Sequence, residues 1–182
     1  MSPPLYHFTT SAHLPWIIES GELRPGSNRI GGFPDPDFIW ATSDSRGDRT
    51  SSAMGGPLYR TGRAWAVRLT LDPADFFRWS EASALFAQWT KEHISLLEWA
   101  AQGKSDPRNW WCRATPLPVS AIRSIEAKPY QGSTWRPVEA EVSTVWNADG
   151  RWLRLTMAGR SFYSRRTLGP QGQDAYELGR EL

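Results

Sequence analysis

The chain has 182 residues, of which 40% are hydrophobic and 22% charged, an ordinary globular composition that excludes general disorder. This length predicts one domain, or one domain with a small appendage, with enough chain to bury a core. The 21 basic and 19 acidic side chains give a net charge of +2, which excludes a histone-like polycation.

Arginine and tryptophan are the residues in excess. Only Lys91, Lys104 and Lys128 are lysines, so nearly all basic side chains are arginines, and the chain contains 11 tryptophans. Arginine pairs with phosphate through its planar fork and stacks on aromatic rings. An Arg- and Trp-rich surface therefore suits a nucleotide or a single-stranded nucleic acid, while tryptophans that simply fill the core are the alternative.

The cysteine and histidine content and the hydropathy of the chain exclude further classes of protein. A single cysteine, Cys112, excludes an internal disulfide and predicts a small buried residue. Three histidines with one cysteine do not support a structural zinc site, so we predict no metal. No charged-then-apolar leader follows Met1, and no apolar run approaches the roughly 20 residues of a membrane helix. We therefore expect a soluble cytoplasmic protein without a membrane partner.

The first half of the chain predicts strands that alternate with helix and loop. Residues 5–9 are mostly aromatic or β-branched and predict a strand. A helix over residues 14–20 follows, and Gly21 is placed to end it. Residues 24–36 are rich in glycine and proline and predict a long loop of the kind that often binds ligands. Further strands are predicted at residues 38–42 and 64–71.

The second half predicts a helical region and then mostly strands. Asp72-Pro73 opens the helical region, and its helical pattern continues over residues 89–103. We assign its buried face to Phe76, Phe77, Trp79, Leu85, Phe86 and Trp89. Strands follow at 110–115 and 122–127, so two packed layers of mixed sheet and helix fit the order up to residue 127.

A different pattern begins at residue 130. Strands at 142–146, 152–156 and 161–167, the first two joined by an Asp-Gly hairpin signal, predict a three-stranded antiparallel β-meander followed by a polar segment, 169–182. We therefore predict an α+β fold with a main domain, residues 1–129, and a β-rich C-terminal extension, residues 130–182. Basic and aromatic residues interleave in this extension: Arg151, Arg154, Arg160, Arg165, Arg166, Trp146, Trp152, Phe162 and Tyr163.

One local motif is more specific than the composition. Tyr6-His7-Phe8-Thr9 runs into the predicted helix and ends at Gly21-Glu22-Leu23. This arrangement resembles the opening of ADP-ribosyltransferases, most of all the DNA-targeting ADP-ribosyltransferase toxins and more distantly RNA 2′-phosphotransferases. Residues 38–42 match the aromatic second strand of these families, and Arg46 or Arg49 matches the arginine that follows it. The detailed likeness covers about residues 5–50, whereas residues 64–127 agree only in the order of their elements.

The resemblance implies an ADP-ribosyltransferase-like mixed sheet that binds NAD as a substrate. In this interpretation His7 and Thr9 hold the ribose side, Trp40 stacks on the nicotinamide, and Arg46 pairs with the pyrophosphate through its fork. The full set of NAD-binding residues that it implies is Tyr6, His7, Thr9, Trp40, Thr42 and Arg46.

The resemblance also implies a catalytic glutamate at the start of the late strand, where it would favour positive charge on the reacting ribose carbon. No carboxylate stands at residues 109–111. Asp106, Glu98 and Glu126 are the acids nearest in sequence, and we select Glu98, together with His7, as the catalytic pair.

These residues predict transfer of ADP-ribose from NAD to a macromolecular acceptor. The resemblance points to DNA or RNA as that acceptor, to a bacterial or phage-related toxin or defence factor, and to an antitoxin protein as partner. NAD hydrolysis would use the same pocket with water as acceptor. The alternative is a non-catalytic module that binds a nucleotide or a single-stranded nucleic acid through the Arg- and Trp-rich extension.

Overall fold

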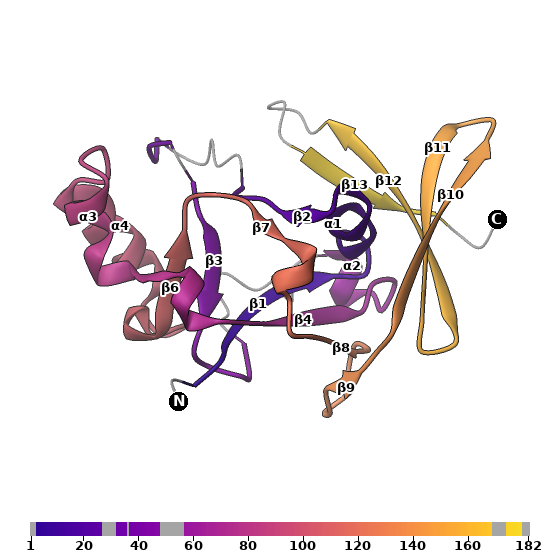
Figure 1. Cartoon of the computed structure of the whole chain (residues 1–182), viewed down its shortest axis with the longest axis horizontal. Helices are drawn as coiled ribbons and strands as arrows, with labels where there is room; N and C mark the ends of the chain where they lie inside the picture. Colours follow the sequence, from indigo (N-terminus) through magenta and orange to yellow (C-terminus); the bar gives the residue numbers. More distant parts are fainter. Residues whose placement is uncertain (1–2, 27–31, 36, 48–56, 169–173, 180–182) are drawn as a thin grey trace.

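A seven-stranded antiparallel sheet forms the centre of the computed structural model, which describes residues 3–26, 32–35, 37–47, 57–168 and 174–179 (Figure 1). The described residues are 24% helix and 40% strand, which confirms the predicted α+β class. In spatial order the strands are β5 (Phe77–Arg78), β6 (Trp110–Arg113), β3 (Ile39–Thr42), β1 (Leu5–Thr10), β4 (Ala66–Leu71), β8 (Ser124–Lys128) and β9 (Arg136–Pro137).

The helices of the described residues are short. Their bounds are α1 (Leu14–Ser20), α2 (Pro57–Arg60), α3 (Ala82–Leu85) and α4 (Lys91–Ala101), with 3-10 turns η2 (Pro73–Asp75), η3 (Trp79–Glu81), η4 (Pro107–Asn109) and η5 (Val119–Ala121). Helix α1 has the predicted bounds because Pro15 fits its first turn and Gly21, at φ 76°, adopts the left-handed conformation that ends a helix. None of these helices is long and apolar enough to cross a membrane.

The two faces of the central sheet carry separate hydrophobic cores, because side chains alternate between the faces of a strand. The first core packs β1 and β4 against α1 and includes Leu5, Leu14, Ile17, Val67, Leu69 and Leu71. The second core packs β3 and β6 against η3 and α4 and includes Phe38, Trp79, Trp89, Trp110 and Cys112. Cys112 is free and buried, as predicted.

The C-terminal sheet has four antiparallel strands where three were predicted: β10 (Ala140–Asn147), β11 (Gly150–Met157), β12 (Arg160–Leu168) and β13 (Asp174–Leu178). The predicted hairpin is confirmed, with Asn147 opposite Gly150. Strand β13 lies within the segment expected to be only polar. It forms because it pairs with β12, where the Arg165 guanidinium meets the Glu177 carboxylate at 2.7 Å.

Helix α1 connects the two sheets. The Trp16 indole N–H donates to the Ser164 hydroxyl at 2.9 Å, and that hydroxyl donates to the Ala12 carbonyl at 2.6 Å. Leu155, Met157 and Phe162 of the C-terminal sheet belong to the first core. A two-stranded sheet, β2 (Glu22–Leu23) with β7 (Leu117–Pro118), adds Leu23 and Leu117 to the same core.

Candidate functional site

The residues of the Tyr-His-Phe-Thr motif divide between the two faces of the central sheet. Tyr6 pairs with Thr42 of β3, so these two side chains share one face, and Trp40 shares it by alternation. His7 and Thr9 point to the other face. The structure therefore brings Tyr6 and Thr42 together, but it does not place the Trp40 ring on the side of His7.

His7 occupies an interruption between two central strands. Among the described residues the β1–β3 ladder has one register pair, Tyr6 with Thr42. Beside that pair, the Trp40 carbonyl accepts a hydrogen bond of 2.8 Å from the Nδ1 atom of His7. An imidazole side chain thus satisfies a backbone carbonyl of the neighbouring strand.

This hydrogen bond fixes the chemistry of the His7 ring. Burial lowers the pKa of His7 below its usual value, and the bond to the Trp40 carbonyl opposes that shift only in part. The ring is therefore neutral at pH 7, with its proton on Nδ1 and an unshared electron pair on Nε2. Nε2 can accept a hydrogen bond from a hydroxyl group, such as that of a ribose.

The face of the central sheet that carries His7 continues across the neighbouring strands β3, β6 and β5. Its side chains there are Ala41, Trp111 and Arg78. Ala41 of β3 pairs with Trp111 of β6, which pairs with Arg78 of β5. Trp111 lies two strand spacings from His7, about 10 Å, and the small Ala41 lies between them. We call His7, Ala41, Trp111 and Arg78 the His7 row.

Two features of the His7 row suit a phosphorylated ligand. The Arg78 guanidinium lies 4.4 Å from the centroid of the Trp111 ring, and no carboxylate among the described residues forms an ion pair with it. The buried Trp111 indole N–H has no acceptor in the described part of the chain. The row therefore offers one acceptor at Nε2 of His7 and two kinds of donor, an indole and a guanidinium.

The other predicted NAD-binding residues have different surroundings. Thr9 is buried with 2% of its surface exposed. Trp40 donates from its indole to Asp37 at 3.1 Å, and its ring lies 5.1 Å from that of Trp79. Arg46 pairs with Asp44 at 3.3 Å in an exposed loop. Arg49, the alternative to Arg46, lies outside the described residues.

None of the three acids considered for catalysis is brought to His7. Glu98 accepts a 3.0 Å hydrogen bond from the indole of Trp79, which belongs to the second core on the opposite face of the sheet. Asp106 caps η4 and pairs with Arg108 at 2.7 Å, and Glu126 pairs with an arginine of β4.

At the start of the late strand, where the resemblance places a glutamate, the chain has Asn109. Its side-chain carbonyl accepts from the Ser43 hydroxyl at 3.1 Å, and its backbone carbonyl accepts from the Ser43 N–H at 3.0 Å. The late strand therefore joins β3 through amide and hydroxyl groups. No group of acidic, histidine or cysteine side chains that could hold a metal occurs in the part of the chain that the structure describes.

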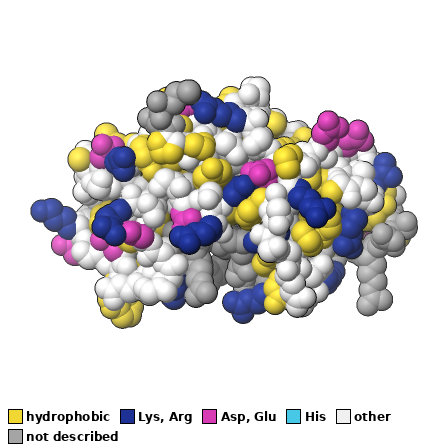
Figure 2. Space-filling model, turned by 90° about the horizontal axis from the view of Figure 1, so that it is seen from below, with side chains coloured by type: hydrophobic (Ala, Val, Ile, Leu, Met, Phe, Trp, Pro, Cys, Tyr) yellow, Lys and Arg dark blue, Asp and Glu magenta, His cyan; other side chains and the backbone are white. Residues whose placement is uncertain are grey.

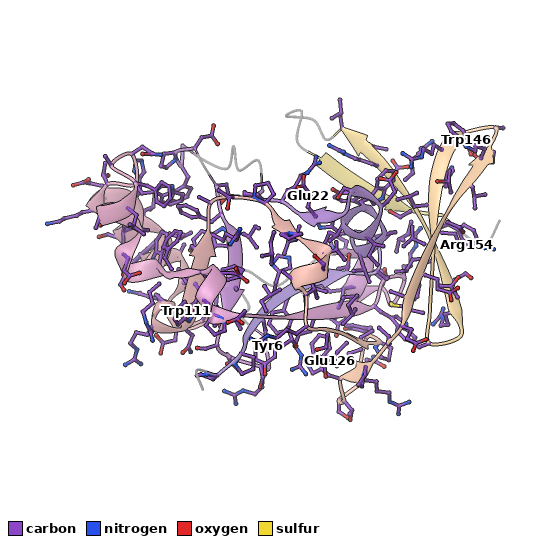
Figure 3. All side chains as sticks on the ribbon, viewed as in Figure 1. Tyr6, Glu22, Trp111, Glu126, Trp146 and Arg154 are labelled. Atoms are coloured by element: carbon purple, nitrogen blue, oxygen red, sulfur yellow. The ribbon has the colours of Figure 1, made fainter. Side chains whose placement is uncertain are left out.

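Tyr6 belongs to a polar cluster on the face opposite His7. The Arg68 guanidinium pairs with Glu126 at 2.7 Å and lies 4.9 and 4.8 Å from the ring centroids of Tyr6 and Trp135. It also donates to the Ser45 carbonyl at 2.5 Å. Figure 3 shows Tyr6 and Glu126 in the same lower region of the central sheet. Because its donors are satisfied within the protein, this arginine joins β4, β8 and the loop after β3.

The arginines of the C-terminal sheet mostly contact the protein itself. Arg151, Arg160 and Arg165 each lie over a tryptophan ring, at 5.7, 5.5 and 5.1 Å. Arg154 is exposed and donates to the Ser143 hydroxyl at 3.2 Å. Figure 2 shows Lys and Arg side chains dispersed among acidic and hydrophobic ones on the face that it displays. Arginine stems that cover aromatic rings account for most of the interleaved pattern.

No family model, curated protein or solved structure matches the chain. The site is therefore defined by its own geometry. Trp111 and Arg78 are the members that sequence reasoning missed. The sequence does carry a signal for Trp111, since adjacent residues of a strand face opposite sides and Trp110 belongs to the second core.

Proposed function

We propose that the protein binds NAD on the His7 row and transfers its ADP-ribose to a macromolecular acceptor. The observation that carries this proposal is His7 itself, a neutral imidazole held between two central strands by the Trp40 carbonyl. The resemblance of the N-terminal motif to ADP-ribosyltransferases supports the choice of NAD. DNA or RNA is the acceptor that this resemblance favours, in a toxin or defence factor with an antitoxin partner.

His7, Arg78 and Trp111 of the row each have a role in this proposal. Nε2 of His7 accepts from a ribose hydroxyl, and Arg78 pairs with a phosphate of the substrate. Trp111 offers its ring edge and its N–H beside the ribose. In the reaction the bond between the ribose carbon and the nicotinamide nitrogen breaks, and neutral nicotinamide leaves with the bonding electrons. A nucleophilic atom of the acceptor then bonds to the ribose carbon and releases its proton to solvent.

A proton NMR time course of NAD with the purified protein tests the proposal. Nicotinamide release that depends on added DNA, RNA or protein identifies a transferase and its acceptor class, whereas release without acceptor identifies hydrolysis. The key variant is His7→Asn, because the asparagine amide can still donate to the Trp40 carbonyl but has no equivalent of Nε2. We expect at least a tenfold slower release from a folded variant. An unchanged rate would remove His7 from the site.

Asn109 favours a second candidate, a nucleotide-binding module without catalysis. An amide in place of the expected glutamate cannot stabilise a developing positive charge as a carboxylate does. This candidate predicts broadening of the NAD signals on binding, but no nicotinamide release with any acceptor. The same spectra therefore distinguish the two candidates.

A further inference from the structure

Strand β10 is a long, unprotected sheet edge. It is the first strand of the C-terminal sheet and has eight residues without lysine or proline. The outer strands of the central sheet, β5 and β9, have only two residues each, and β9 contains Pro137. Short edge strands and prolines are the usual means by which proteins prevent pairing between edges. Strand β10 lacks both.

The hairpin geometry shows which backbone groups of β10 face outward. Asn147 and Gly150 flank a two-residue turn, so they form a hydrogen-bonded pair, and every second residue before Asn147 also bonds to β11. The N–H and C=O groups of Val142, Thr144 and Trp146 therefore point away from β11. No hydrogen bond joins these groups to another described residue.

The exposed end of the hairpin also carries one large apolar side chain. Trp146 has 72% of its surface exposed, and Figure 3 shows it near the outer end of the β10–β11 hairpin, away from the central sheet. A tryptophan this exposed beside unpaired backbone groups is typical of a surface that another strand covers.

A second copy of β10 fits this edge. In an antiparallel pair with the two-fold axis normal to the sheet, Thr144 lies opposite Thr144 of the other copy and Val142 lies opposite Trp146. In this register the outward backbone groups of one copy lie opposite those of the other. The Trp146 side chain of each copy packs on Val142 of the other, which gives two aromatic contacts with a β-branched residue. Glu141 lies opposite Asn147, so no like charges face one another. A register shifted to place Ser143 opposite Ser143 would set Trp146 against Ala140, a smaller contact.

We propose that the protein forms a two-fold symmetric dimer in which two β10 strands pair through Val142, Thr144 and Trp146. The two C-terminal sheets then form one continuous eight-stranded sheet. This proposal is independent of any activity at the His7 row.

Sedimentation velocity of the full chain tests the dimer. Between about 1 and 100 µM we expect the average mass to rise from 20.6 kDa toward twice that value, since edge pairing alone gives modest affinity. Thr144→Pro removes the outward N–H at the two-fold axis. Thr144→Lys places two positive charges, one from each copy, opposite each other at the same point. Each variant should weaken dimerisation at least tenfold. Thr144→Val keeps the N–H and should dimerise as the parent does. A parent chain that stays at 20.6 kDa, or charged and proline variants that still dimerise, would overturn the proposal.

Cysteine variants test the register. A hydrogen-bonded antiparallel pair places its Cα atoms about 5.5 Å apart, a separation that a disulfide spans. Thr144→Cys should therefore cross-link on oxidation, whereas Ser143→Cys, which lies opposite Val145, should not. The natural Cys112 is buried and does not compete. Cross-linking of the Ser143 variant instead would show the shifted register and contradict the proposed one.

Discussion

Replacement of Arg78 by glutamine tests where a phosphate binds on the proposed site. Arg78 lies over the Trp111 ring at 4.4 Å, and the structure shows no ion pair between it and a described carboxylate, so its charge is available to a ligand. A hydrogen bond to a charged group contributes about 1.5–3 kcal/mol, equivalent to roughly 10- to 150-fold in affinity. Because Arg78 is exposed, solvent and salt reduce this contribution, and we expect about a tenfold loss of affinity.

The matched control for Arg78→Gln is Arg46→Gln. Arg46 is the arginine that the sequence resemblance favours, and its side chain is 89% exposed beside Asp44. Isothermal titration with NAD and with ADP-ribose, at low and moderate salt, gives the affinities of the parent and both variants. We expect a loss for both ligands with Arg78→Gln only. Weaker binding with Arg46→Gln and parental binding with Arg78→Gln would refute the reasoning from strand register.

Two further predictions concern stability. The pKa of folded His7 lies below the 6.5 of a free histidine, so below pH 6.5 the unfolded chain binds more protons. The free energy of unfolding should therefore fall with decreasing pH, by at most about 1.4 kcal/mol per pH unit, and urea titrations of His7→Asn should show a flatter profile. Arg68→Met should lower the free energy of unfolding by about 3 kcal/mol, because Glu126 is left without its partner at 18% side-chain exposure. The double variant with Glu126→Leu should recover most of that loss, and a double variant no more stable than the single one would contradict this account.

The sequence predicted elements well where the signal was local. The bounds of α1 follow from Pro15 and Gly21, whose preferences act within one turn. The hairpin at Asn147 and Gly150 follows from a turn signal of the same kind. Strand β13 could not be predicted this way, because residues 174–178 become a strand only by pairing with β12.

The composition of the candidate site depended on information that local patterns do not contain. Pairing of β6 with both β3 and β5 brings Trp111 and Arg78 together, although they lie 33 positions apart in the sequence. Sequence spacing carries no signal for such a register, since it is set by packing of the whole sheet. Glu98 was selected from the helix before the late strand, and the structure places its carboxylate against Trp79 of the second core, on the face opposite His7.

A four-residue strand motif can present only half of its side chains to one ligand, because neighbours point to opposite faces. If His7 binds the substrate, then Tyr6 must serve the other face, where it contacts Arg68. The residues that complete a site around His7 have to come from neighbouring strands and point to the same face of the sheet as His7. Ala41 of β3 and Trp111 of β6 meet this condition. A motif of this length therefore locates a site on a strand, but the register of the sheet decides which residues share it.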